Sequence, residues 1–126
     1  MSAPECSRGD IWMLDWNPGR GSEQRGVRPG VIVQCDEGNH AAGARTTILV
    51  PLTTQGRPYA FYVPVPRSAA TGLRANSWAN CTQVFTIDRD RLHSRLGSVS
   101  GPVLDAIGLA LADTLGLPAA GEDERG

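Results

Sequence analysis

Lysine is missing from the sequence, and all twelve basic residues are arginine. Long apolar runs are also missing, since none approaches the roughly 18 consecutive residues that a membrane span requires. The first ten residues, MSAPECSRGD, lack the basic and then apolar pattern of a secretory signal. The missing membrane span and the missing secretory signal predict a cytoplasmic protein that makes no contact with a membrane.

Cysteine and histidine are too few and too scattered to indicate a disulfide framework or a metal site. The three cysteines, Cys6, Cys35 and Cys81, are odd in number and widely separated. The two histidines, His40 and His93, show no ligand spacing such as HxxxH. We therefore expect no bound metal, and we expect the thiols to have no chemical role.

Sequence motifs for three common kinds of catalysis are absent as well. There is no GxSxG nucleophile elbow, no GxxxxGK(S/T) phosphate loop and no GxGxxG that follows a strand. The glycine-rich stretch GRGSEQRG matches none of these patterns. We therefore expect no cofactor, and hydrolysis by a metal, a serine triad or a nucleotide motor is unsupported.

The composition is that of an ordinary soluble globular protein. Of the 126 residues, 40% are hydrophobic, and the formal net charge is -1. This length predicts a single domain over residues 1–126, with a frayed tail at 118–126.

Charge is divided unequally along the chain. Residues 20–74 carry seven arginines and three acidic residues, whereas residues 88–126 carry seven acidic residues and four arginines. The first of these segments is therefore the place to look for an anionic partner. Each arginine offers a planar group of several donors that suits phosphate.

Short segments rich in β-branched and aromatic residues predict a mostly β protein. Alternation over Asp10–Trp16 puts Trp12, Leu14 and Trp16 on one face of a strand. Pro64 either confines its strand to an edge of the sheet or bends it. The remaining predicted strands are 31–34, 46–52, 59–65, 77–87 and, more weakly, 95–98.

Only the end of the chain is typical of a helix. Pro102 suits the first turn, and Gly116 with Pro118 ends the pattern. The apolar residues at helical spacing are Leu104, Ile107, Leu111 and Leu115. Many short strands followed by one helix predict an α+β fold that is mostly β, either a small barrel or a coiled sheet capped by the helix.

Three motifs carry a resemblance to a known family. The stretches RGDIWMLDW, NPGRGSEQRGVRPGVIVQ and VPLTTQ resemble, in order and spacing, those of the MazF/PemK family of toxin endoribonucleases. The likeness runs from about Arg8 to Leu117 and is strongest over residues 8–55. It implies a small SH3-like barrel of about five to seven strands with a C-terminal helix.

The resemblance also implies an activity and partners. Members of the family are homodimers that cleave single-stranded RNA at short specific sequences without a metal. They generally leave a 2′,3′-cyclic phosphate and a 5′-hydroxyl, and each is neutralised by a cognate antitoxin. For this chain the resemblance implies a MazE-like antitoxin with an acidic tail.

Residue by residue, the resemblance implies a catalytic Arg28, from the RP dipeptide, and a catalytic Thr53, from PLTTQ. Glu23 belongs to the same motif as Arg28. Because a guanidinium is a poor base, Glu23 or a bound water is as plausible an acceptor of the substrate proton as Arg28. The expected substrate-binding residues are Ser22, Gln24, Arg25, Thr54, Gln55, Arg57, Arg74 and Gln83.

Two positions depart from the family pattern. Arg25 stands where relatives often have a small residue, so a catalytic role for it does not follow. Thr82 stands before Gln83 where many relatives have an acid, so RNA specificity can differ here.

Other interpretations remain open at this stage. Arg28 could pair with Glu23 only to brace the loop, and Thr53 could be an ordinary residue at the end of a strand. The chain could also be a gyrase-poisoning toxin with a similar barrel, or a non-catalytic SH3-like module that binds RNA or peptide. Trp12, Trp16 and Trp78 are expected in the core, with Trp16 nearest the arginine-rich loop.

Overall fold

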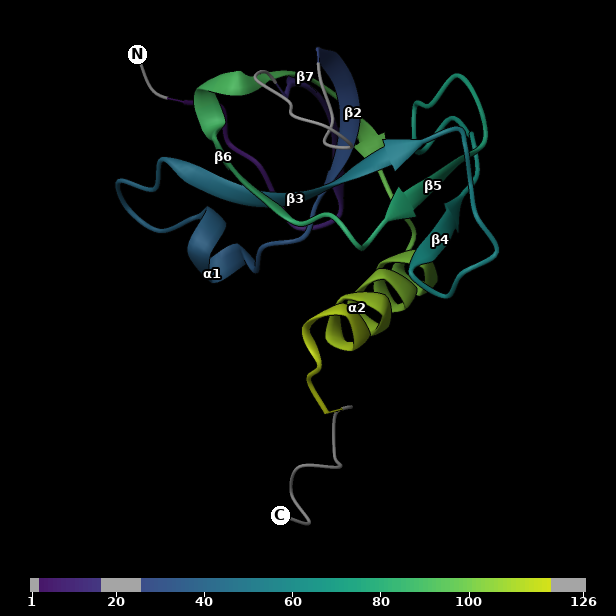
Figure 1. Ribbon diagram of the computed structural model, residues 1–126. Coiled ribbons are helices and arrows are strands. Elements are labelled where there is room, and N and C mark those ends of the chain that lie inside the picture. The colour runs from purple at the N-terminus through teal and green to yellow at the C-terminus, as the bar shows by residue number, and fades with distance from the viewer. Residues whose placement is uncertain (1–2, 17–25, 119–126) are drawn as a thin grey trace.

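The computed structural model describes residues 3–16 and 26–118, which form one bent antiparallel sheet with a helix against it (Figure 1). The strands are β1 (Asp10–Asp15), β2 (Val27–Ile32), β3 (Thr46–Thr53), β4 (Tyr62–Val65), β5 (Ser77–Asn80), β6 (Phe85–Asp88) and β7 (Leu92–Ser98). The helices are α1 (Asp36–Asn39) and α2 (Gly101–Leu115), with a 3₁₀ turn at Arg89–Arg91. The expected mostly β fold with a C-terminal helix is confirmed.

The strands pair in the order β4, β5, β3, β2, β1, β7, and β6 pairs with the first half of β3. Every one of these pairs is antiparallel. Pro64 lies in β4, which pairs only with β5, so the predicted edge position of this proline is confirmed.

The single strand predicted at 77–87 is wrong. The segment forms β5 and β6, which pair with opposite ends of β3. Between them the Asn80 side chain accepts hydrogen bonds from the Thr82 backbone N–H at 3.1 Å and from the Thr82 hydroxyl at 2.6 Å. This local bonding interrupts the strand and lets the chain follow the edge of β3 in two steps.

Other strand boundaries differ from the predictions. β2 begins at Val27 rather than residue 31, because β1 continues to pair with it as far as Asp15. β4 begins only at Tyr62, whose backbone N–H closes a turn to the Tyr59 carbonyl at 3.0 Å. β7 begins at residue 92 rather than 95, and the short helix α1 was not predicted.

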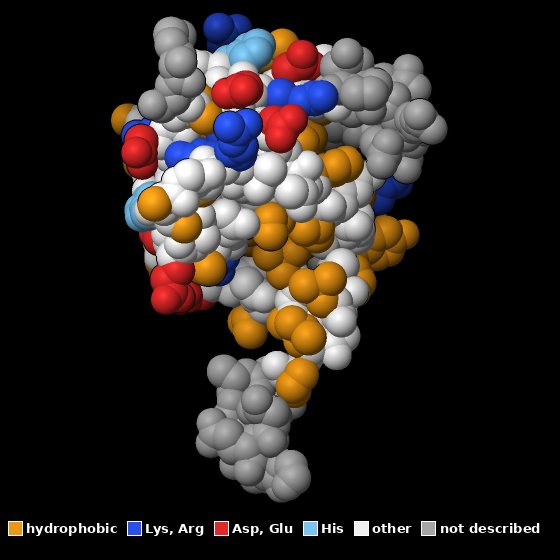
Figure 2. All heavy atoms as spheres, turned by 90° about the vertical axis from the view of Figure 1, so that its left-hand side faces the viewer, with side chains coloured by type: hydrophobic (Ala, Val, Ile, Leu, Met, Phe, Trp, Pro, Cys, Tyr) orange, Lys and Arg blue, Asp and Glu red, His pale blue; other side chains and the backbone are white. Residues whose placement is uncertain are grey.

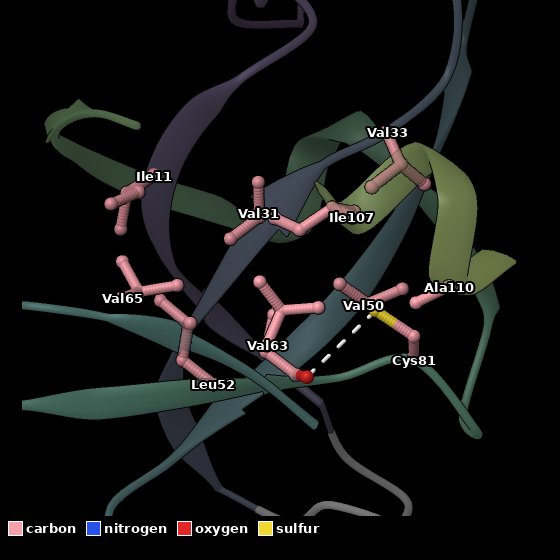
Figure 3. Close-up of a cluster of buried hydrophobic side chains, with 11 residues drawn as sticks. Ile11, Val31, Val33, Val50, Leu52, Val63, Val65, Cys81, Ile107 and Ala110 are labelled. Atoms are coloured by element: carbon pink, nitrogen blue, oxygen red, sulfur yellow. Dashed lines mark hydrogen bonds between the residues drawn. The ribbon is translucent and has the colours of Figure 1, made fainter. Parts of the chain in front are cut away.

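The sheet buries apolar side chains on both faces. The first cluster joins β1, β2, β3 and β4 to α2, and its side chains converge in Figure 3. Its members include Ile11, Val31, Val50, Val63 and Ile107. Each fully buried aliphatic side chain of this size contributes roughly 1.5–3 kcal/mol to folding.

The second cluster lies on the other face of the sheet. It contains Trp12, Leu14 and Trp16, so the predicted common face of these residues is confirmed. Ile32 and Leu49, which pair with each other between β2 and β3, also belong to it.

Helix α2 begins and ends as its sequence predicts. The Ser100 hydroxyl accepts a hydrogen bond from the Val103 backbone N–H at 3.3 Å, and Gly116 adopts a left-handed conformation with φ of 70°. Leu109 and Leu115 are exposed, and in Figure 2 hydrophobic side chains gather toward this helix. No helix in the described part of the chain is long and apolar enough to cross a membrane.

The three thiols form no disulfide. Cys6 and Cys81 are buried and Cys35 is exposed. Burial raises the pKa of the Cys81 thiol to about 11, which keeps it protonated and unreactive at neutral pH.

We predict that Gly97→Ala destabilises the protein, because a Cβ at this position would lie 2.1 Å from the Ala70 carbonyl oxygen. Overpacking against backbone typically costs about 1–3 kcal/mol. Thermal melts measure the effect. The control is Gly101→Ala, whose Cβ would meet nothing within 4 Å. Equal melting temperatures for the two variants would contradict the packing of β7 against the segment before β5.

Candidate functional site

The pairing of β2 with β3 brings Arg28 and Thr53 to the same end of the sheet. Gly30 pairs with Pro51 and Ile32 with Leu49. Continuing this register by two residues beyond Gly30 sets Arg28 opposite Thr53. Residues directly opposite in an antiparallel pair project from the same face, so this register assigns both side chains to one face of the sheet.

The adjacent strands extend this site on both sides. Arg28 also pairs with Leu14 of β1, and Thr53 pairs with Trp78 of β5. In Figure 1 this is the end at which the arrowhead of β3 lies beside β5. The Arg28 side chain is exposed, whereas Thr53 and Trp78 are half-buried. The site is therefore an open surface across the ends of four strands.

The Thr53 hydroxyl is held by the turn that follows β3. Its oxygen accepts a hydrogen bond from the Gln55 backbone N–H at 3.0 Å, which leaves the hydroxyl proton to be donated elsewhere. Gly56 lies directly on the Trp78 indole, where a Cβ would come within 2.4 Å of the ring. Trp78 therefore packs beneath this turn. It is half-buried and belongs to neither core cluster, so its expected core position is wrong.

Two further arginines are close in sequence to the strands that form this end of the sheet. Arg57 follows Gly56, and Arg74 lies in the connection that leads into β5. Both side chains are exposed, as are those of Thr54 and Gln55. Gln83 is half-buried in the turn between β5 and β6, beside the middle of β3.

Ion pairs do not engage these basic groups within residues 3–16 and 26–118. The ion pairs found there join His40 to Asp36 and Arg95 to Asp10. Arg28, Arg57 and Arg74 therefore have no carboxylate partner among the described residues. Within the same ranges, no group of three or more histidine, cysteine or acidic side chains could hold a metal ion.

Four of the predicted site residues, Ser22, Glu23, Gln24 and Arg25, lie outside the described residues. The two ends of their segment are nevertheless close together, because the Trp16 backbone N–H donates to the Gly26 carbonyl at 2.9 Å. Trp16 and Gly26, the described residues on either side of that segment, therefore lie next to each other at the end of the sheet that carries Arg28.

Trp16 contacts the site in a way that the sequence did not reveal. Its indole N–H donates to the Arg28 carbonyl oxygen at 3.1 Å, and its side chain is only 4% exposed. The predicted core position of Trp16 is confirmed. Its position beside the arginine-rich loop was the one sequence signal that pointed to this contact.

A cleft of about 580 Å³ lies at the opposite end of β3, between the N-terminal segment, α1 and the end of β6. Buried Arg89 contributes to its wall and donates to the carbonyl oxygens of Pro4, Asn39 and Ala44. These bonds tie three separate segments together. We therefore assign Arg89 to the fold and not to a ligand site.

Known proteins are similar to this chain in sequence and in fold. The chain is 35% identical over 108 residues to endoribonuclease MazF9 of Mycobacterium tuberculosis, which covers 82% of this chain and 91% of that protein. It is 33% identical over 113 residues to endoribonuclease MazF of Staphylococcus saprophyticus, with 87% and 91% covered. A solved mycobacterial endoribonuclease in complex with its cognate antitoxin has a TM-score of 0.74 and 26% identity, over 90% of this chain and 97% of that one.

Residues 7–115, which include β1 through α2 and both Arg28 and Thr53, match one family profile. The chain therefore belongs to the family of PemK-like, MazF-like toxins of type II toxin-antitoxin systems.

Proposed function

We propose that this protein is a toxin endoribonuclease that cleaves single-stranded RNA at short specific sequences. The observation that carries the proposal is the pairing of β2 with β3, which brings the exposed Arg28 and the hydroxyl of Thr53 to the same end of the sheet. The similarity to proteins named endoribonuclease MazF supports the same activity.

The proposed reaction is an internal transfer at phosphorus. The ribose 2′-oxygen forms a bond to the adjacent phosphorus, and the bond from phosphorus to the 5′-oxygen of the next nucleotide breaks. The 2′-hydroxyl proton passes to a base, and the departing 5′-oxygen takes up a proton. The products are a 2′,3′-cyclic phosphate and a 5′-hydroxyl, so no water is consumed in this step.

The two residues supply complementary donors for this reaction. The Arg28 guanidinium can donate two parallel hydrogen bonds to phosphoryl oxygens, and the Thr53 hydroxyl can add a third. Both stabilise the negative charge that grows on phosphorus-bound oxygens in the transition state. Glu23 or a bound water is as plausible an acceptor of the 2′-proton as Arg28, because a guanidinium is a poor base.

The surrounding polar residues would hold the rest of the RNA. Arg57 and Arg74 are exposed and have no described carboxylate partner, so they are available to phosphates on either side of the cleaved bond. Thr54 and Gln55 extend the turn beside Thr53 and offer hydrogen bonds to bases or sugars. Ser22, Gln24, Arg25 and Gln83 complete the proposed substrate-binding set.

The proposal includes a cytoplasmic homodimer and a cognate antitoxin with an acidic tail. A solved relative is described as an endoribonuclease in complex with its cognate antitoxin. The site arginines, which have no carboxylate partner among residues 3–16 and 26–118, attract carboxylates for the same reason that they attract phosphates. An acidic antitoxin tail should therefore occupy the RNA site and displace RNA.

We predict that cleavage persists in EDTA and requires the 2′-hydroxyl, because arginine and threonine donors supply the charge stabilisation. A long RNA is incubated with the purified protein, and its cut sites and end groups are mapped. An otherwise identical RNA with a 2′-deoxy nucleotide before the cleaved phosphate should remain intact. Cleavage of that RNA would mean that water is the nucleophile. The absence of any cleavage of the natural RNA would favour a protein that only binds its target.

We predict that Arg28→Lys lowers kcat nearly as much as Arg28→Ala, by a factor on the order of 10²–10³, because lysine keeps the charge but loses the paired donors. Arg45→Lys is the matched control, since Arg45 is exposed and precedes the opposite end of β3. Its activity should equal that of the wild type. Melting temperatures should change little, since an exposed charge contributes little to stability. A nearly full rate for Arg28→Lys would show that Arg28 acts only as a point charge. Unfolding of Arg28→Ala would show that Arg28 braces the loop instead.

We predict that the antitoxin and RNA compete for the site and that the antitoxin binds more weakly as salt rises. The measurement is a titration of antitoxin into a mixture of toxin and labelled RNA that carries the 2′-deoxy substitution. RNA should be released in proportion to antitoxin bound. A stable complex of all three components would refute the shared site.

A further inference from the structure

Trp16 is a core residue that bonds directly to the backbone of the candidate site. Its backbone N–H donates to the Gly26 carbonyl at 2.9 Å, and its indole N–H donates to the Arg28 carbonyl at 3.1 Å. One side chain and its own backbone therefore hold the start of β2 at two points. The segment between them contains only Val27.

The indole is fixed by close packing on both sides. A Cβ on Gly30 would lie 2.7 Å from the Trp16 Cζ2 atom, so only glycine leaves room for the ring at this position. Gly30 does not have a positive φ, so the requirement is for space and not for backbone conformation. Phe85 meets the indole edge-on, with ring centroids 5.0 Å apart and an angle of 70°.

The indole bond acts on a residue that pairs with Leu14 of β1 but has no pair in β3. The pairs between β2 and β3 end at Gly30, which lies two residues after Arg28 in the sequence. Pro29 lacks a backbone N–H and so adds no donor to the ladder. The indole of Trp16 supplies a bond to Arg28 just beyond that point.

We infer that Trp16 is a positioning residue, which sets the orientation of the Arg28 backbone so that the guanidinium meets the phosphate. This inference rests on the proposed RNA cleavage. A displacement of about 1 Å at a reacting group can cost roughly 10²-fold in rate, so a single backbone anchor is sufficient to matter.

The test compares Trp16→Phe with Trp12→Phe. Both residues lie in the second cluster with 4% and 7% exposure, and each indole N–H donates one hydrogen bond. The Trp12 bond goes to the Asp10 carboxylate at 3.3 Å, away from the start of β2. The two variants therefore lose similar packing, but only one loses the bond to Arg28.

Trp16→Phe should lower kcat by roughly 10- to 100-fold with KM nearly unchanged, because RNA still binds but the guanidinium is misaligned. Trp12→Phe should lower the melting temperature by a similar amount and leave kcat near that of the wild type. Equal kcat values for the two variants would overturn the inference. A wild type that does not cleave RNA would instead overturn the proposed function.

A second pair of variants tests the same anchor through Gly30. Gly30→Ala should displace the indole and reproduce the loss of kcat. In the Trp16→Phe background the same change should cost little more, because phenylalanine lacks the atom that the new Cβ would meet. If kcat of the double variant falls by the product of the two single losses, the two substitutions act independently, and a shared mechanism is contradicted.

A measurement on the wild type keeps the inference testable if these variants fail to fold. The indole N–H signals of Trp16 and Trp12 are followed by NMR while uncleavable 2′-deoxy RNA is added. The Trp16 signal should shift and the Trp12 signal should not. An unmoved Trp16 signal at saturating RNA would show that its bond does not sense the occupied site.

Discussion

The antiparallel register between β2 and β3 is the constraint on which the site depends. It is set by the pairs from Gly30 with Pro51 to Ile32 with Leu49, and Ile32 and Leu49 are buried together in the second cluster. A slip of one residue would turn these side chains toward the opposite face at a large cost in burial. The same pairing brings Arg28 and Thr53 to one end of the sheet, so the burial that fixes the core also orders the site.

The arginines of this chain serve two different purposes, and their surroundings distinguish them. Arg89 is buried and donates to backbone carbonyls of three segments, while Arg95 pairs with Asp10 at 3.1 Å. Arg28 is exposed and has no described carboxylate partner. Its backbone is nevertheless held by a buried tryptophan. A guanidinium that lies on a fixed backbone and has no carboxylate partner among the described residues suits recognition of a phosphate, since little of the geometry must be organised on binding.

Local sequence was sufficient for the elements whose causes are local. The alternation of Trp12, Leu14 and Trp16 predicted β1, and the cap residues predicted both ends of α2. The start of β2 at Val27 was missed because its pairing with β1 comes from a distant segment. For the site, the motifs and the family resemblance pointed to Arg28 and Thr53. Their relative position, however, depends on the register of two strands, which the sequence does not reveal. The contact between Trp16 and Gly30 likewise depends on how β1 packs beside β2.

The central claim is that Arg28 and Thr53 act together on one phosphate. It is tested most directly by a crystal structure with an RNA that carries a 2′-deoxy nucleotide before the phosphate to be cleaved. The account predicts that this phosphate accepts hydrogen bonds from both the Arg28 guanidinium and the Thr53 hydroxyl, with the Arg28 carbonyl still bonded to the Trp16 indole. A phosphate bound elsewhere, such as in the cleft beside Arg89, or held by Arg28 without Thr53, would contradict it.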